Sequence, residues 1–315
     1  MTMTDKRIFS LPSLSESVIM ILSLAIWLAV TLLCVGFRPE HLALALLICA
    51  LFFSSLPSRK LIVALLPFVA FGISYDWMNL LPNYEVNPID VVGIYETEKG
   101  LFGISSPDGV LTPNEFFARH TSASMDFLAG IFYLCWVPLP VFYGLWLYAR
   151  GRREGYLHFA LVFLLVNLIG FALYYVHPAA PPWYIAIYGA IADTSTPGNM
   201  AGLAAFDAMT GLSVFHGLYE RNANVFAAFP SLHSAYTLVA FIYALRLKSS
   251  LLWRVLLGVV TAGIWFTAVY TSHHYIIDVA GGIFCAIAGY LIFEYVLMKI
   301  PAFSRFIYKY TLYIS

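Results

Sequence analysis

The sequence predicts an all-α protein that crosses a membrane several times. Of the 315 residues, 61% are hydrophobic and 11% are charged, whereas about a quarter of the residues of a soluble domain are charged. The charges also leave uncharged segments of about 20 residues, the length of a spanning helix. This composition excludes a soluble globular enzyme. The equal totals of Lys plus Arg and Asp plus Glu, 17 each, argue against a nucleic-acid partner.

The uncharged segments place about eight transmembrane helices along the chain. Five segments contain no charged residue and predict helices over 16–37, 40–57, 124–149, 231–247 and 251–272. Three less regular segments predict helices over 60–79, 155–177 and 275–298. The last of these contains Glu294, which we expect to reach the interface from near the helix end. A count of six spans would keep the same orientation, so six and eight both remain open.

The cations predict which face each loop occupies. With eight spans both termini share one face, and 13 of the 17 Lys and Arg residues fall on that face. Because cytoplasmic loops are enriched in Lys and Arg, both termini are predicted to be cytoplasmic. The two long loops, 80–123 and 178–230, then lie on the non-cytoplasmic face, where we expect the chemistry. Within them, Thr112 predicts a capped helix start, and residues 200–215 predict an interfacial helix.

Two short motifs carry residues with catalytic potential, and both lie where a predicted helix begins on the non-cytoplasmic side. His233 lies in Phe229 to Ser234, and His274 precedes Asp278 by four residues. On a helix, His274 and Asp278 share one face, so the carboxylate can accept from one imidazole nitrogen and leave the other free to attack. His273 has no such partner. A helix starting near Ser231 can bind phosphate through its free N–H groups.

Other readings of these residues stay open at this point. His233, His274 and Asp278 are suitable metal ligands by type. Ser231 or Ser234 could serve as a hydrolase nucleophile, although no nucleophile elbow surrounds them. A transporter or scaffold is a third reading, but its polar residues would be expected near the midplane rather than at one interface. Ionisable residues at membrane depth are costly, so their joint presence favours catalysis.

At these residues the sequence resembles the type 2 phosphatidic acid phosphatase (PAP2) superfamily, and within it the inositol phosphorylceramide synthases of fungi and bacteria. The superfamily motif Pro-Ser-Gly-His is matched by Pro230 to His233, with Leu232 in place of Gly. The motif His-x-x-x-Asp is matched by His274 and Asp278. The Lys/Arg-Pro motif of the phosphatases is absent, and Ala268 stands at the Arg position of their third motif.

Further segments resemble the synthase branch. They are His177 to Tyr184, Ala228 to Ser234, and Thr271 to Gly282, with a looser similarity at Glu98 to Gly103. The resemblance therefore covers about residues 170–285. It implies one integrated membrane domain with N-terminal helices and the first outer loop in 1–123, a PAP2-like catalytic core in 124–300, and a cytoplasmic tail in 301–315.

The resemblance implies transfer of phosphoinositol from phosphatidylinositol to ceramide through a phosphohistidine, without a metal or another cofactor. His274 would be the nucleophile, Asp278 its partner and His233 the proton donor and acceptor. Alternatives are a lipid phosphatase of the same fold and a synthase that uses another head group, such as phosphoethanolamine. The oligomeric state is not indicated. The site would face the bacterial periplasm or the Golgi lumen.

The resemblance also implies substrate-binding residues around the catalytic ones. They are Ser231, Ser234, His273, Tyr275, His177, Pro182, Trp183 and Tyr184, with Arg119 and Arg221 as candidate cations for the phosphate. Taken alone, prolines followed by aromatic residues are also typical of a helix boundary at a membrane interface.

Overall fold

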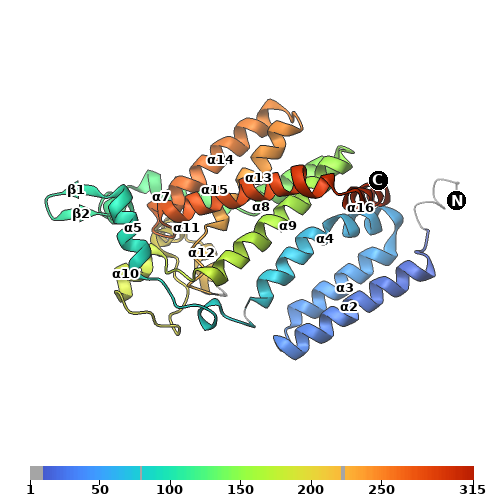
Figure 1. Cartoon of the computed structure of the whole chain (residues 1–315), viewed down its shortest axis with the longest axis horizontal. Coiled ribbons are helices and arrows are strands. Elements are labelled where there is room, and N and C mark those ends of the chain that lie inside the picture. Colours follow the sequence, from blue (N-terminus) through green and yellow to red (C-terminus); the bar gives the residue numbers. More distant parts are fainter. Residues whose placement is uncertain (1–9, 79, 221–223) are drawn as a thin grey trace. The chain divides into compact units, whose positions relative to one another are not determined.

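The computed structural model describes residues 10–78, 80–220 and 224–315, and most of them lie in helices (Figure 1). The chain divides into two compact units. Unit 1 comprises Met1–Leu81 and Pro301–Ser315, and unit 2 comprises Pro82–Ile300. The helical content and the long apolar helices confirm the predicted α-helical membrane fold. The domain boundary at residue 123 stays a prediction.

The described residues of unit 1 contain four helices: α2 (Leu14–Cys34), α3 (Pro39–Ser54), α4 (Leu56–Trp77) and α16 (Pro301–Ile314). Ser13 and Glu16 form a capping box that begins α2, because each side chain satisfies a free backbone N–H of the other. The C-terminal helix α16 packs against α4, where the Tyr310 hydroxyl donates to the Val63 carbonyl at 2.6 Å.

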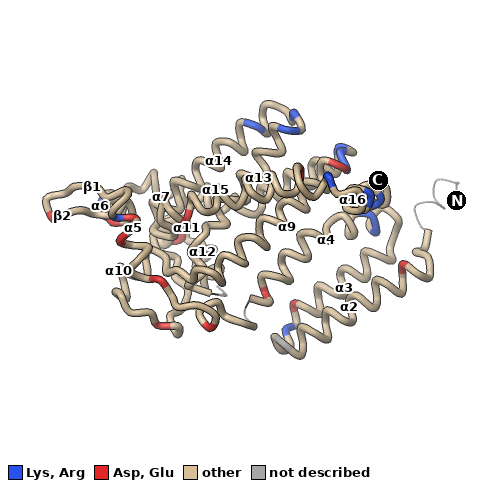
Figure 2. The backbone as a smooth tube through the Cα atoms, viewed as in Figure 1, with Lys and Arg blue, Asp and Glu red and all other residues tan. Residues whose placement is uncertain are grey.

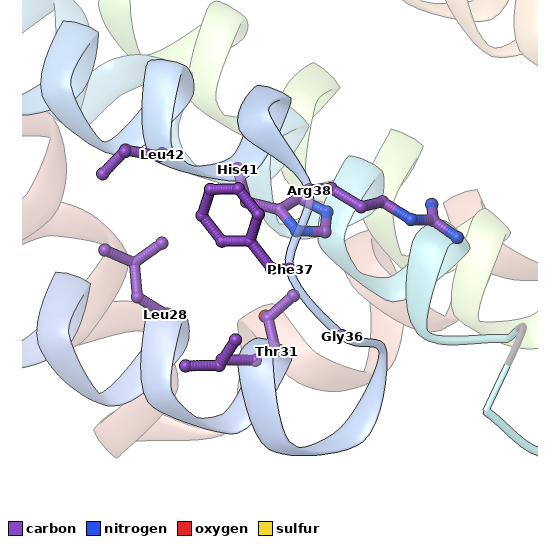
Figure 3. A pocket seen from close by; sticks show the side chains of 8 residues that line it. Leu28, Thr31, Gly36, Phe37, Arg38, His41 and Leu42 are labelled. Carbon is purple, nitrogen blue, oxygen red and sulfur yellow. The ribbon is translucent and has the colours of Figure 1, made fainter.

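A small cavity of about 170 Å³ lies between the adjoining ends of α2 and α3 (Figure 3). Its wall includes Arg38 and His41, both of which bond to Asp76 at 2.8 and 3.0 Å. The rest of the lining is mostly apolar, so these two contacts join the start of α3 to the end of α4.

The long helices of unit 2 form a bundle around α13. They are α7 (Ala123–Leu134), α8 (Pro138–Ala149), α9 (Arg153–Val176), α13 (Leu232–Arg246), α14 (Leu251–Tyr270) and α15 (Ile276–Leu291). Helix α13 packs against α8, α9, α14 and α15. Its buried residues therefore lie all round the helix, as expected for a bundle centre, and they include every position from Ser234 to Ala240.

One end of this bundle carries a group of short elements. They are α5 (Val92–Phe102), the hairpin strands β1 (Ile104–Ser106) and β2 (Gly109–Leu111), α6 (Pro113–Arg119), α10 (Pro182–Tyr188), the 3₁₀ turn η2 (Ala201–Leu203), α11 (Ala204–Thr210) and α12 (Val214–Glu220), with a further 3₁₀ turn, η1 (Asn83–Glu85). The capped helix start predicted at Thr112 is confirmed, because Thr112 and Glu115 form a capping box on α6. The helix predicted over 200–215 is present as η2 and α11 but ends at Thr210.

Each of the eight predicted spans contains helix, with one correction. Residues 124–149 were expected to form a single helix, but α7 and α8 are separate and bent by 43°. The break precedes Pro138, which lacks the N–H that a continuous helix needs, and Pro140 follows. Among the described residues, five helices are long and apolar enough to span, and the bent pair makes six. Since α3 and α13 have only 16 and 15 residues, a count of eight stays a prediction.

Glu294 also differs from expectation. It lies in a π-helical turn, Ile292–Val296, that continues α15 into the 3₁₀ turn Leu297–Lys299. Its side chain is only 3% exposed. It accepts from Arg246 at 2.7 Å, Tyr243 at 2.6 Å and His158 at 2.9 Å. The buried charge is satisfied by these three partners, so it has no need to reach water.

The charges of unit 2 are separated along the bundle (Figure 2). Lys and Arg gather where α8 meets α9 and where α13 meets α14, and most Asp and Glu lie at the other end, over α5, α6 and α11. This separation within unit 2 agrees with the sidedness that the sequence predicts, in which the short elements are non-cytoplasmic.

Candidate active site

Two imidazole rings face each other between α13 and α15. His233 lies in the first turn of α13, and His274 lies two residues before α15 begins. His233 Nδ1 and His274 Nε2 are 3.1 Å apart, so one of these nitrogens carries the proton that the other accepts. His274 is only 5% exposed, and the pair is therefore largely shielded from solvent.

The second nitrogen of His274 has two oxygen neighbours. Nδ1 lies 3.0 Å from the Ala228 carbonyl oxygen and 3.5 Å from Asp278 Oδ2. A carbonyl only accepts, so Nδ1 carries the proton and the Nε2 lone pair points at His233. We expected His274 and Asp278 to share one face of a helix. His274 instead precedes α15, so the two residues do not pair through helical periodicity. Asp278 Oδ2 instead folds back to accept from the Tyr275 N–H at 2.8 Å.

The two rings are brought together by a close contact between α13 and α15. The Ser231 N–H donates to the Asp278 carbonyl at 2.8 Å. Gly282 lies opposite, and a Cβ atom there would be 2.0 Å from the Ser231 carbonyl oxygen. A side chain at this position would therefore force the helices apart. We call this contact the α13–α15 seam, defined by Ser231, Asp278 and Gly282.

Ser231 and Ser234 are both buried and bond to each other at 3.1 Å between their hydroxyl oxygens. Within the described part of the chain, neither hydroxyl is hydrogen-bonded to a histidine. A serine nucleophile needs a base within hydrogen-bond reach, so this geometry does not favour a serine hydrolase.

Two buried polar side chains hold the segment that carries His274. The Glu98 carboxylate accepts from the N–H groups of Ile276 at 2.9 Å and Ile277 at 3.2 Å, and thus caps α15. Burial raises the pKa of the Glu98 carboxyl, and the two N–H bonds partly oppose this rise. The Asn114 amide donates to two carbonyls, one of which is that of His274, at 2.9 Å. In the sequence, Glu98 belongs to a segment that loosely resembles the synthases, but nothing there indicated that it caps α15.

Aromatic rings enclose the histidines. Tyr133 stacks on His233 with ring centroids 5.0 Å apart, and Trp136 lies 4.4 Å away. Tyr219 of α12 donates its hydroxyl proton to the Tyr133 hydroxyl at 3.1 Å and lies 4.7 Å from the His273 ring. We missed these three residues in the sequence, because nothing local to each one indicates that they meet.

His273 lies beside the pair, and its environment favours the uncharged form of its ring. Its Nδ1 lies 2.9 Å from the Thr271 hydroxyl, and its side chain is buried. Burial lowers the pKa of His273 to about 3, and the neighbouring His274 contributes to the fall. The ring is therefore neutral at physiological pH and supplies no positive charge to a phosphate.

The other residues predicted to bind substrate lie farther out. Arg119 forms an ion pair with Asp108 at 2.8 Å, with side chains 49% and 72% exposed. His177 pairs with Asp90 at 3.3 Å. Arg221 falls outside the described residues. Within the described contacts, neither Arg119 nor His177 touches the histidine pair, and their substrate-binding roles stay predictions.

Pro182 begins α10, and the next two residues pack in a buried cluster. Trp183 and Tyr184 contact Val91 and Phe226 there. The Trp183 N–H donates to the Ser272 carbonyl at 3.1 Å, which ties α10 to the segment before His273. This arrangement accounts for the aromatic residues as packing elements, and a role in substrate binding remains a prediction.

In the described residues, no group of three or more His, Cys, Asp or Glu side chains is arranged to hold a metal ion. Together, the spanning helices and the histidine cluster define an integral membrane enzyme. The chain belongs to the PAP2 superfamily, whose family model matches residues 110–292.

Several synthases are similar to this chain. The phosphoinositol dihydroceramide synthase of Bacteroides thetaiotaomicron is 56% identical over 97% of this chain and 100% of its own length. The inositol phosphorylceramide synthase catalytic subunit of Saccharomyces cerevisiae is 28% identical over 73% of this chain and 55% of its own length. The inositol phosphorylceramide synthase of Candida albicans is 28% identical over 58% of this chain and 38% of its own length. No solved structure is a significant match.

Proposed function

We propose that this protein is a lipid phosphotransferase that moves phosphoinositol from phosphatidylinositol to ceramide or dihydroceramide and releases diacylglycerol. The names of the similar synthases contain the transferred phosphoinositol group and the ceramide or dihydroceramide acceptor. The observation that carries the chemistry is the 3.1 Å approach of His233 to His274, with Asp278 behind the latter. Such a pair provides a nucleophile and a proton donor at one phosphorus atom.

In the first step, His274 Nε2 attacks the phosphorus of phosphatidylinositol. An N–P bond forms while the bond from phosphorus to the diacylglycerol oxygen breaks, and His233 gives its proton to that oxygen. The ring of His274 becomes positively charged in this step. The Ala228 carbonyl and the Asp278 carboxylate, 3.0 and 3.5 Å from Nδ1, stabilise this charge.

In the second step, the acceptor hydroxyl attacks the phosphohistidine. His233 removes the hydroxyl proton, an O–P bond forms, and the N–P bond to His274 breaks. The aromatic rings of Tyr133, Trp136 and Tyr219 around the histidines support transfer over hydrolysis, because a dry site favours an acceptor delivered from the bilayer over water.

The phosphate oxygens are expected at the start of α13 rather than α15. Three N–H groups at the start of α15, those of Tyr275, Ile276 and Ile277, are taken by carboxylates. In the described chain, no acceptor bonds to the N–H groups of Leu232 and His233. Free N–H groups at a helix start bind phosphate, and this start adjoins the nucleophile. We expect the site to face away from the cytoplasm.

A labelled-substrate assay tests the proposal. The purified protein in lipid nanodiscs receives phosphatidylinositol labelled in its inositol ring, with and without ceramide and in the presence of a chelator. We expect ceramide-dependent label in a lipid product that survives chelation, and none with His274→Ala. Release of water-soluble label with or without ceramide would identify a phosphatase-type hydrolase. Preferential transfer from phosphatidylethanolamine would reassign the head group.

A further inference from the structure

We propose that the cavity beside Asp126 and Tyr270 holds the inositol ring of the donor lipid, a proposal that rests on the function above. The cavity has a volume of about 360 Å³, which falls within the range of small-molecule sites. It lies among α6, α7, η2, α11 and the end of α14, and its wall consists of Ala118, Thr121, Asp126, Ala201, Gly202, Ala205, Tyr270, Thr271 and Ser272.

The cavity adjoins the histidine cluster through one short segment. Thr271 lines the cavity, and its hydroxyl bonds to His273 Nδ1 at 2.9 Å. Ser272 also lines it, and only one residue separates Ser272 from His274. Because successive Cα atoms are 3.8 Å apart, the Cα atoms of Ser272 and His274 lie at most about 7.6 Å apart. The cavity wall and His274 therefore belong to one short segment of the chain.

The polar groups of the wall suit a ring bearing several hydroxyls. The Tyr270 hydroxyl donates to Asp126 Oδ1 at 2.5 Å, which fixes the carboxylate and leaves Oδ2 able to accept from a ligand. A carboxylate accepts up to four hydrogen bonds, and Ser272 and Thr121 add hydroxyls that both donate and accept. Small residues form much of the remaining wall, leaving room for a ring.

The backbone around the cavity is held in an uncommon conformation. Ala201 and Ser272 have φ values of +42° and +60°, although left-handed backbone disfavours residues other than Gly. The Gly202 N–H donates to the Thr271 carbonyl at 3.1 Å, and a Cβ at Gly202 would lie 2.9 Å from the Thr271 Cα. Such strain persists where the surrounding contacts enforce it, commonly at ligand sites. The wall is therefore built with a fixed shape.

The reaction itself requires a ring site of this kind. In both proposed steps the inositol stays attached to phosphorus, while diacylglycerol leaves and ceramide arrives. A site that grips the ring must lie beside the nucleophile and apart from the two exchanging lipids. The cavity meets the first requirement through Thr271 and Ser272.

Asp126→Asn tests the inference, with Asp193→Asn as the matched control. Asp193 is an exposed outer-loop carboxylate that bonds to Ser195. We expect the Asp126 variant to lose ten- to a hundredfold in kcat/KM for phosphatidylinositol, the usual effect of a lost hydrogen bond to a charged group. For ceramide, kcat/KM should change less than threefold, because the ring is already covalently held in that step. Asp193→Asn should match wild type.

A second variant, Ala205→Leu, fills the cavity without touching the carboxylate and should show the same selective loss. An equal loss in both kcat/KM values would mean structural damage and would overturn the inference. So would an Asp126 variant that stays within twofold of wild type for phosphatidylinositol, or a wild type that prefers an ethanolamine donor. A wild-type protein without any transfer activity would instead refute the proposed function.

Discussion

Replacing Asp278 with Asn separates two roles of this carboxylate. The Asn amide oxygen can still accept from the Tyr275 N–H, which Asp278 Oδ2 now does at 2.8 Å. The Nδ1 proton of His274 is also held by the Ala228 carbonyl at 3.0 Å. The fold and the tautomer of His274 should therefore survive, and the change removes mainly one negative charge.

The size of the effect follows from the distance between that charge and the ring. Asp278 Oδ2 lies 3.5 Å from His274 Nδ1, and in the proposed mechanism the ring turns positive as the phosphohistidine forms. At an effective dielectric constant of about 20, a unit charge pair at this distance interacts by about 4–5 kcal/mol. Loss of this stabilisation in the transition state corresponds to about a 10³-fold fall in kcat.

Ceramide conversion by purified Asp278→Asn, His274→Ala and Asp193→Asn proteins measures this effect. Thermal melting establishes that each variant is folded. Asp278→Asn should retain activity about 10³-fold below wild type yet above His274→Ala, and Asp193→Asn should match wild type. A fall of less than tenfold would refute the electrostatic role. A fall to the His274→Ala background would refute the idea that the Ala228 carbonyl keeps the tautomer.

Four further perturbations test other parts of the structure. The pKa of His273 is about 3 in the folded state and 6.5 in the reference state. Unfolding below pH 6.5 therefore takes up a proton, and the free energy of unfolding falls by up to about 1.4 kcal/mol per pH unit. His273→Gln should flatten the fall in melting temperature between pH 7.5 and 5, with less than a tenfold loss of activity. In a background without the four native cysteines, an impermeant reagent should label Ser195→Cys but not Arg152→Cys from outside, and labelling of both would contradict the predicted topology. Tyr219→Ala opens the aromatic cover and should raise the ratio of inositol phosphate released to lipid product, whereas an unchanged ratio would show that the cover does not exclude water. Gly282→Ala should lower kcat about a hundredfold, since a shift of about 1 Å is enough for such a loss; wild-type activity in this variant would show that the helices tolerate the added methyl group.

The sequence predicted the elements that depend on local composition. In the described chain, segments with few or no charges located the long helices other than α16, because exclusion of charge from the bilayer is a property of the segment itself. Pro138 is a sequence signal for the break between α7 and α8. We nevertheless predicted one helix there, because the segment is apolar throughout. Glu98 and Tyr219 could not be assigned, because each reaches the site from a distant part of the chain.

The same limit applies to the phosphate-binding cation. Counting cations on the predicted outer face selected Arg119, yet its partner in the structure is Asp108. The sequence reveals which charges share a face but not which of them pair there. The motif spacing correctly predicted that His274 and Asp278 lie close together, but helical periodicity is not the reason. Asp278 accepts from the Tyr275 N–H, just before its own helix begins.

The α13–α15 seam divides the protein into a part that resists change and a part that can vary. At Gly282 there is no space for even one methyl group, so the alignment of the two histidines tolerates almost no alteration along the seam. On the cavity wall, Asp126 and Ala205 do not contribute to the seam, so their side chains can be exchanged without altering the contact that aligns His233 and His274. Altered head-group preference should therefore arise through substitutions in this wall, and the same phosphoryl-transfer chemistry can serve several lipid classes from one scaffold.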